Sequence, residues 1–332
     1  MIWETTQVGN SVNKSSTKTS PDLKAMGGCD FCHMQLISQK VCWRLVSIMM
    51  QNRYANSHQQ EASFPRPQLV GEGQHPDKMQ GHWVLVRAGK RVLRPGGLEL
   101  TRQMLNTLAI SPHDHVVEFA PGLGGTARMV LQRGPSAYWG VEREPAAAEY
   151  LRRQLAGLGA QIVLGQAEES GLPSACASVV YGEAMLSMQA QDQKSRIFAE
   201  ARRLLAAGGR YGIHELCFLP DDISDRVRHE IQAAMSKEIH VGVQPLSRSE
   251  WVQLFEQNGM KVIWCGEAPM HLLEPRRVLQ DEGVRGGLRI AFNMATNPTL
   301  RHRILAMRRL FRKYEEHLGA ISMVGRREPG KV

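Results

Sequence analysis

His115-Val-Val-Glu-Phe-Ala-Pro-Gly-Leu-Gly-Gly-Thr-Ala127 is the stretch that decides the fold. It is a short apolar strand with an acid near its end, followed by a glycine turn and the start of a helix. Gly122 and Gly124 allow a tight turn and close approach of a ligand to the backbone, while the first amides of the helix face the same crevice. The stretch therefore predicts a nucleotide-type cofactor site.

Two kinds of cofactor fit this loop. The spacing Gly122-x-Gly124-x-x-Ala127 matches the dinucleotide fingerprint, and Glu142 follows at about the distance of a ribose-binding acid, as in an NAD(P)-dependent Rossmann oxidoreductase. Glu118, however, precedes the glycines. It would repel a pyrophosphate but attract a cofactor that carries an ammonium group and a sulfonium. This acid favours the second kind of cofactor.

Short apolar strands and helices alternate around the loop. The expected strands are residues 116–119, 138–142, 161–164, 178–182 and 210–216. The expected helices are residues 98–108, a helix from Gly125, residues 145 to about 155, and a helix through Ile197 and Leu205 that stops at Gly208 and Gly209. This alternation predicts an α/β fold with a doubly wound, mostly parallel sheet, which binds ligands at the carboxyl ends of its strands.

The pattern changes after residue 216. We expect helical cap segments at residues 217–247 and 275–318, over the strand ends, with a helix at 249–258, a strand at 260–265 and a last strand at 320–325. In the helix at 301–318 one stripe is apolar: Ile304, Met307, Phe311, Tyr314 and Leu318. A packed helix with a solvated basic face is the simpler interpretation, and a surface for anionic lipid, RNA or an acidic substrate is the alternative.

Four blocks carry a resemblance to a known family. They are residues 116–127, Tyr138-Trp-Gly-Val-Glu142, Gly165-Gln-Ala-Glu-Glu-Ser-Gly-Leu-Pro173 and Arg203-Leu-Leu-Ala-Ala-Gly-Gly-Arg-Tyr-Gly-Ile-His-Glu215. Together they resemble the class I S-adenosylmethionine-dependent methyltransferases, in particular the small-molecule branch with the ubiquinone-type (type 11) enzymes. The match covers about residues 97–216. Ala120 stands where the family's first glycine is usual, and Gln166 stands where an acid is usual.

The resemblance implies a Rossmann-like, seven-stranded, mostly parallel sheet and S-adenosyl-L-methionine as cofactor. It implies that Glu142 accepts hydrogen bonds from both ribose hydroxyls and that Glu118 lies nearest the ammonium end. The expected cofactor-binding positions are Glu118, Ala120, Gly122, Gly124, Glu142, Ala167 and Glu168. Ala167 and Glu168 match the adenine-side block and would act mainly through the backbone. The sequence indicates no metal ligand in this site.

The candidate catalytic residues are Glu183 and His214, which end the fourth and fifth strands. Methyl transfer needs an acceptor held in line with the methyl group, and a base is needed only if the acceptor arrives protonated. Each residue could instead be structural, because a histidine at a strand end is often satisfied by packing and one hydrogen bond. Tyr181 could place a ring near the sulfonium, or simply fill the core.

Charge and composition narrow the class of protein further. The net charge of +9 is concentrated at the ends of the 332-residue chain, since residues 301–332 hold nine Lys and Arg against three acids. Residues 1–78 lack a sustained apolar period, and we expect a disordered extension ahead of a methyltransferase domain at 79–332. Cys29-Asp-Phe-Cys32-His33 matches a haem or zinc spacing, but a chance match is favoured.

These observations predict an S-adenosylmethionine-dependent methyltransferase that acts on a small molecule. We expect a cytoplasmic protein, because the sequence has neither a signal peptide nor an apolar run long enough to cross a membrane. We do not expect nucleic acid as the substrate, since no Asn/Asp-Pro-Pro-aromatic motif follows the fourth strand. A homodimer stays open. The rival hypotheses are an NAD(P)-dependent oxidoreductase and a non-catalytic or RNA-binding protein that uses the basic C-terminal helix.

Overall fold

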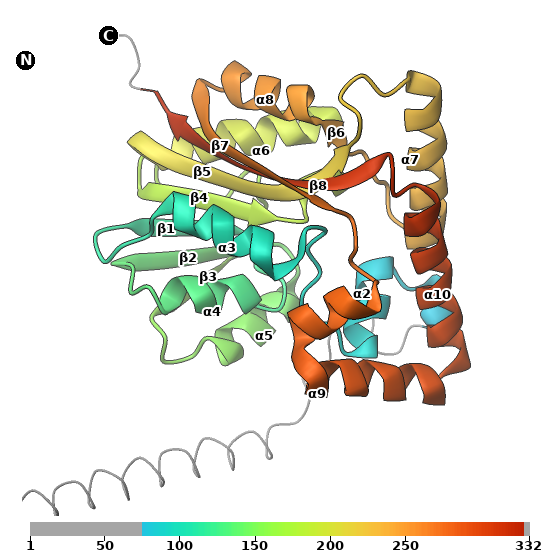
Figure 1. Ribbon diagram of the computed structural model, residues 1–332. Coiled ribbons are helices and arrows are strands. Elements are labelled where there is room, and N and C mark those ends of the chain that lie inside the picture. Colours follow the sequence, from blue (N-terminus) through green and yellow to red (C-terminus); the bar gives the residue numbers. More distant parts are fainter. Residues whose placement is uncertain (1–74, 329–332) are drawn as a thin grey trace, which may run out of the picture. The chain divides into compact units, whose positions relative to one another are not determined.

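One sheet organises residues 75–328, the part of the chain that the computed structural model describes (Figure 1). Its strands are β1 (His115–Phe119), β2 (Ala137–Glu142), β3 (Ala160–Leu164), β4 (Ala177–Glu183), β5 (Leu205–Phe218), β6 (Leu246–Ser247), β7 (Met260–Pro269) and β8 (Leu318–Arg327). Their order is β3-β2-β1-β4-β5-β8-β7, and β6 pairs with β5 beside this path. The predicted seven strands are therefore present, and the two-residue β6 is an addition.

The pairing directions follow the prediction of a mostly parallel sheet. β3, β2, β1, β4 and β5 run parallel, while β8 pairs antiparallel with both β5 and β7. The carboxyl ends of β1, β2 and β4 consequently lie at one edge, at Phe119, Glu142 and Glu183. This edge is where an open α/β sheet binds its ligand. The expected doubly wound α/β fold is confirmed.

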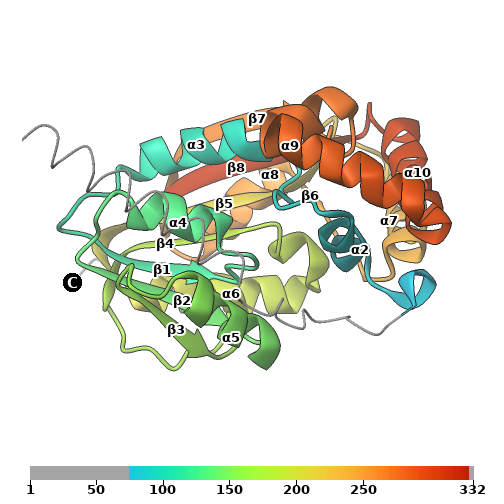
Figure 2. The ribbon, with the colours of Figure 1, turned by 90° about the horizontal axis from the view of Figure 1, so that it is seen from below.

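Helices cover both faces of the sheet (Figures 1 and 2). One core joins strands to α3 (Gly97–Leu108), α4 (Gly125–Leu131) and α5 (Pro145–Gln154). The other joins strands to α6 (Gln191–Leu204) and α8 (Arg248–Gln257), where Phe198, Trp251 and Phe255 are fully buried. Burial of such large side chains stabilises each layer by roughly 1.5–3 kcal/mol per residue.

A cap with its own apolar core stands at the carboxyl-end edge (Figure 1). It is built from α2 (Gly81–Ala88), α7 (Asp225–Ile239), α9 (Pro275–Thr296) and α10 (Pro298–Lys313), with the 3₁₀ turn η1 (Pro76–Lys78) before α2. The stripe predicted in the C-terminal helix is buried there, from Ile304 to Leu318. This burial agrees with the interpretation of that helix as a packed one.

Several boundaries differ from the prediction. α6 ends at Leu204 and β5 begins at Leu205, because the alanines and glycines that follow continue the strand and do not extend the helix. Leu318 begins β8 and does not end α10, although it packs on the same core. α2 was not predicted as a helix. Residues 1–74, which hold most of the predicted extension and the Cys29–His33 motif, lie outside the described residues.

Candidate active site

The glycine turn after β1 has the backbone that the sequence predicted. Ala120, Gly122 and Gly124 all have positive φ, of 51°, 59° and 73°. A Cβ atom built on Gly122 would meet nothing nearer than the Ala120 carbonyl oxygen at 4.0 Å, so this side of the turn is open. Gly124 is the N-cap of α4, whose first amides have no side-chain cap. The turn therefore offers free backbone donors to a ligand.

Glu142 ends β2 beside this turn. Its side chain accepts a hydrogen bond from the Glu144 amide at 3.1 Å on Oε1, and only 7% of the residue is exposed. Burial raises the pKa of the Glu142 carboxyl, and hydrogen bonds from neighbouring amides partly offset that rise. A carboxylate can accept about four hydrogen bonds, so Glu142, which already accepts from the amides of Gly122, Arg143 and Glu144, keeps acceptor capacity for a ligand hydroxyl.

The loop after β3 offers mainly backbone groups to a ligand. Gln166 and Glu169 form an isolated antiparallel bridge that turns the chain here. Ala167 packs against the edge of the core, and Glu168 Oε1 accepts a hydrogen bond from Gln193 Nε2 at 2.8 Å. The carboxylate of Glu168 is thus tied to α6, which leaves the backbone of the loop as the part free to contact an adenine.

Glu118 is buried, and two tyrosines contact its carboxylate. The hydroxyls of Tyr138 and Tyr181 both donate to its Oε2, and the residue is 4% exposed. Burial raises the pKa of Glu118 to about 7, against the lowering effect of the two hydroxyls. Tyr181 is thereby fixed as a core residue on this acid. The Glu118 carboxyl therefore changes charge near neutral pH.

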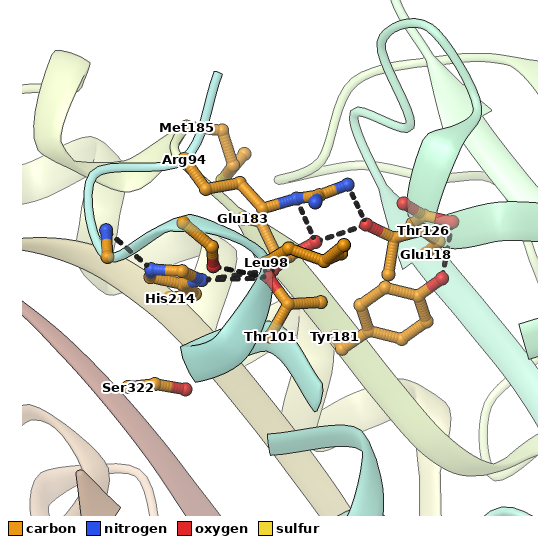
Figure 3. A network of polar contacts seen from close by, with 12 residues as sticks. Arg94, Leu98, Thr101, Glu118, Thr126, Tyr181, Glu183, Met185, His214 and Ser322 are labelled. Carbon is orange, nitrogen blue, oxygen red and sulfur yellow. Dashed lines mark hydrogen bonds and ion pairs between the residues drawn. The ribbon is translucent and has the colours of Figure 1, made fainter. Parts of the chain in front are cut away.

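Glu183 is the centre of a buried network of polar side chains (Figure 3). Arg94 Nε lies 2.9 Å from its Oε2, which also accepts from the Thr126 hydroxyl, and the Thr101 hydroxyl donates to its Oε1 at 2.5 Å. Burial alone would raise the pKa of this carboxyl, but Arg94 and His214 lower it to about 2. Glu183 is therefore an anion at every pH at which the protein is expected to work.

His214 is joined to Glu183, as the adjacent ends of β4 and β5 predict. The Gly96 amide donates to its Nε2 at 3.0 Å, so that nitrogen carries no proton. The ring proton is then on Nδ1, which lies 3.1 Å from Glu183 Oε1. His214 is fully buried. With both nitrogens engaged and no exposure, the geometry favours a positioning role over that of a base.

The neighbouring Glu215, the next residue of β5, faces the other way. Its carboxylate accepts from the amides of Met185, Leu186 and Ser187 and from the Ser187 hydroxyl, at 2.7–2.9 Å. It therefore fixes the turn that follows β4 and so the direction in which Glu183 leaves the strand.

Arg94 reaches the network from residues 89–97, which lead from α2 to the first residue of α3. Acids of α9 hold this segment: Glu282 Oε1 accepts from the amides of Arg91 and Val92 at 2.8 Å, and Asp281 Oδ1 accepts from the Leu98 amide at 3.0 Å. Lys90 Nζ lies 3.6 Å from Glu282 and 3.8 Å from Asp281, with all three side chains 2% exposed. The cap thus determines where Arg94 is placed.

Arg94 still has an unused donor. Its Nη1 is buried and makes no hydrogen bond, while Nη2 donates to the Thr126 hydroxyl at the start of α4. A buried guanidinium nitrogen without an acceptor costs free energy until a ligand supplies one. Arg94, Thr101 and Thr126 were not among the predicted site residues. Their only sequence signals were a basic residue before Pro95-Gly-Gly97 and a threonine inside the glycine turn.

Comparisons with known proteins agree with this geometry. A family model described as "Methyltransferase domain" matches residues 116–209. An uncharacterised protein of Haemophilus influenzae is 30% identical over 217 residues, which are 64% of this chain and 84% of that protein. The model match falls on the segment that carries the sequence resemblance and confirms it.

Solved structures share the fold at low sequence identity. A putative sarcosine dimethylglycine methyltransferase of Galdieria sulphuraria has a TM-score of 0.54 at 16% identity, over 75% of this chain and 98% of that one. A phosphoethanolamine N-methyltransferase 2 of Haemonchus contortus, in complex with phosphomonomethylethanolamine and S-adenosylhomocysteine, has a TM-score of 0.58 at 13% identity, over 80% of this chain and 61% of that one. At these identities the likeness concerns the fold alone.

Proposed function

We propose that this chain, which belongs to the class I S-adenosylmethionine-dependent methyltransferase family, transfers the methyl group of S-adenosylmethionine to a small-molecule acceptor that faces Glu183. One observation carries the proposal. The glycine turn, Glu142 and the Glu183 network meet at the carboxyl edge of the sheet, under a cap that the same chain builds. We expect an acceptor bound beneath that cap to be small.

The described residues fit the cofactor piece by piece. Glu142 suits the ribose hydroxyls, and the backbone at Ala167 and Glu168 suits the adenine. Ala120, Gly122 and Gly124 let the chain approach the ligand closely. For the amino-acid tail, Glu118 supplies negative charge toward the ammonium group, and the unpaired Arg94 Nη1 is a donor for the carboxylate.

When bound, the cofactor supplies an electrophilic methyl group on a sulfonium. With a pKa of about 2, Glu183 is too weak a base to remove a proton effectively near neutral pH. The Glu183 oxygens already accept from Thr101, Thr126 and Arg94. We infer that Glu183 acts on the acceptor by holding these neighbours in place, and that His214 positions Glu183 through Nδ1. Rate acceleration then comes from proximity and alignment.

The substrate class and the assembly are further parts of the proposal. We expect a small-molecule acceptor and no nucleic acid, and a homodimer stays a prediction. Among residues 75–328, no helix is both long and apolar enough to span a bilayer.

The proposal is tested by incubating the full chain with methyl-labelled S-adenosylmethionine and fractionated metabolite extracts. We expect label in a small-molecule fraction, and Glu183→Gln should mainly raise the apparent KM for that acceptor with little change in pH dependence. Exposed Glu149→Gln is the matched control, since its side chain is 50% exposed on α5. Label only in RNA or protein would contradict a small-molecule acceptor.

A further inference from the structure

The outer face of α9 carries an apolar stripe that the fold does not use. Val284, Leu288 and Phe292 are 69%, 66% and 67% exposed and lie four residues apart, so they share one side of the helix. Leu279, one turn before the non-helical Gly283, is 49% exposed. Among the described residues these are four of the seven large hydrophobic side chains that are exposed. Such clustering indicates an interaction surface.

The opposite side of α9 already holds the helix on the cap. Ile290 is buried in the cap core, and Asn293 Nδ2 donates to the Ala88 carbonyl at 2.9 Å. Arg289 lies between the two sides: it is exposed, and its Nη2 donates to the Gly89 carbonyl at 2.7 Å. Figures 1 and 2 show α9 at the outside of the cap, with α2 on its inner side and α10 at an angle at its end. The exposed stripe is therefore available to an external surface without any rearrangement of the cap.

The helical sequence that carries the stripe is basic beyond Asp281 and Glu282, two acids that are buried against Lys90. From residue 283 to residue 314 the sequence holds seven Arg, one Lys and no Asp or Glu. By helical period the exposed Arg285 and Arg289 flank the stripe on one side. The basic residues of α10 are less free, because Arg308 and Arg312 pair with Glu274 and Lys313 pairs with Glu230. The basic side chains beside the stripe that are available to an external partner are therefore those of α9.

We propose that this face of α9, defined by Val284, Leu288 and Phe292 with Arg285 and Arg289, binds the surface of an anionic lipid bilayer. Apolar side chains beside arginines, on a helix that lies flat on the protein, match the chemistry of a bilayer interface with acidic headgroups. A symmetric contact between two copies of this face would bring the arginines of both copies together without an acid between them. RNA would neutralise the arginines but leave the apolar stripe in water.

Sedimentation of the full chain with lipid vesicles tests this. We expect binding to vesicles of phosphatidylcholine with about one third phosphatidylglycerol, weak binding to phosphatidylcholine alone, and loss of binding at high salt. Leu288→Ser/Phe292→Ser should weaken binding at least about tenfold, and Arg285→Gln should weaken it only for the anionic vesicles. Leu158→Ser is the control, since Leu158 is 47% exposed in the turn before β3.

Equal binding by the control and the double variant would overturn the proposal, as would absence of binding by the unmodified chain. Light scattering tests whether a second copy of the chain covers this face instead. If the unmodified chain is a dimer that does not bind vesicles, and the double variant is a monomer, the face belongs to a second copy. Binding to RNA in place of vesicles would also overturn the proposal. The melting temperatures of the variants should match that of the unmodified chain, because the substituted side chains are exposed.

Discussion

Glu183→Ala is expected to lower the free energy of unfolding by about 3–5 kcal/mol, the cost of leaving a buried charge without its partner. Glu183 is 6% and Arg94 10% exposed at the side chain, so solvent cannot replace the lost carboxylate. Thr101, Thr126 and His214 would lose their shared acceptor as well.

Urea unfolding of a double-mutant cycle measures this effect. Adding Arg94→Met to Glu183→Ala should restore a large part of the loss, because no unpaired guanidinium then remains buried. Exposed Glu149→Ala on α5 should change stability by less than about 0.5 kcal/mol. A loss below about 1 kcal/mol in Glu183→Ala would mean that the network is open to water.

Arg94→Met is expected to weaken binding of S-adenosylhomocysteine by about ten- to a hundredfold, while the affinity for 5′-methylthioadenosine changes little. The two ligands share the adenosine and the thioether, and only the first has the amino-acid tail. A charge-assisted hydrogen bond contributes roughly 1.5–3 kcal/mol, which gives that range. The donor assigned to the carboxylate is the buried Arg94 Nη1, which makes no hydrogen bond in the protein itself.

The same two ligands test whether Glu118 attracts the ammonium group of the amino-acid tail. Its folded-state pKa of about 7 lies above the ordinary value, so the carboxyl is protonated below pH 7 and ionised above it. The ammonium group of the cofactor prefers the ionised form. S-adenosylhomocysteine should therefore lose up to about tenfold in affinity per pH unit as the pH falls from 7 to 5, with release of a proton on binding. The affinity for 5′-methylthioadenosine, which lacks the ammonium group, should not change in this way.

Calorimetry measures both effects. Arg91→Met is the matched control for Arg94→Met, since Arg91 lies on the same segment and is exposed. Equal losses for the two ligands would mean that Arg94 acts through the fold of the turn and not on the tail.

Those parts of the site that belong to a strand end or to the turn directly after a strand could be predicted from the sequence. Gly122, Gly124 and Glu142 belong to local patterns whose backbone conformation follows from the residue types. The contact of Glu183 with His214 was also predictable, because β4 and β5 are adjacent parallel strands and these two residues are partners in the register, although β5 continues to Phe218.

The contacts that determine the charge of Glu183 and the hydrogen bonding of His214 were not predictable. Arg94 joins Glu183 across 89 positions of sequence, and the acids of α9 hold the 89–97 segment across more than 180. No local pattern encodes such pairs. The low pKa of Glu183 and the closed hydrogen bonding of His214 follow from them, so the sequence could nominate these residues but not distinguish a base from a positioning group.

Titration of Glu142→Ala with S-adenosylhomocysteine, followed by calorimetry, tests most directly whether the cofactor lies at the carboxyl edge of the sheet. If Glu142 holds the ribose, the unmodified chain should bind one equivalent and the variant should bind about ten- to a hundredfold more weakly, with the same loss for 5′-methylthioadenosine. Unchanged affinity in the variant would remove Glu142 from the site and contradict the assignment of this edge to the cofactor.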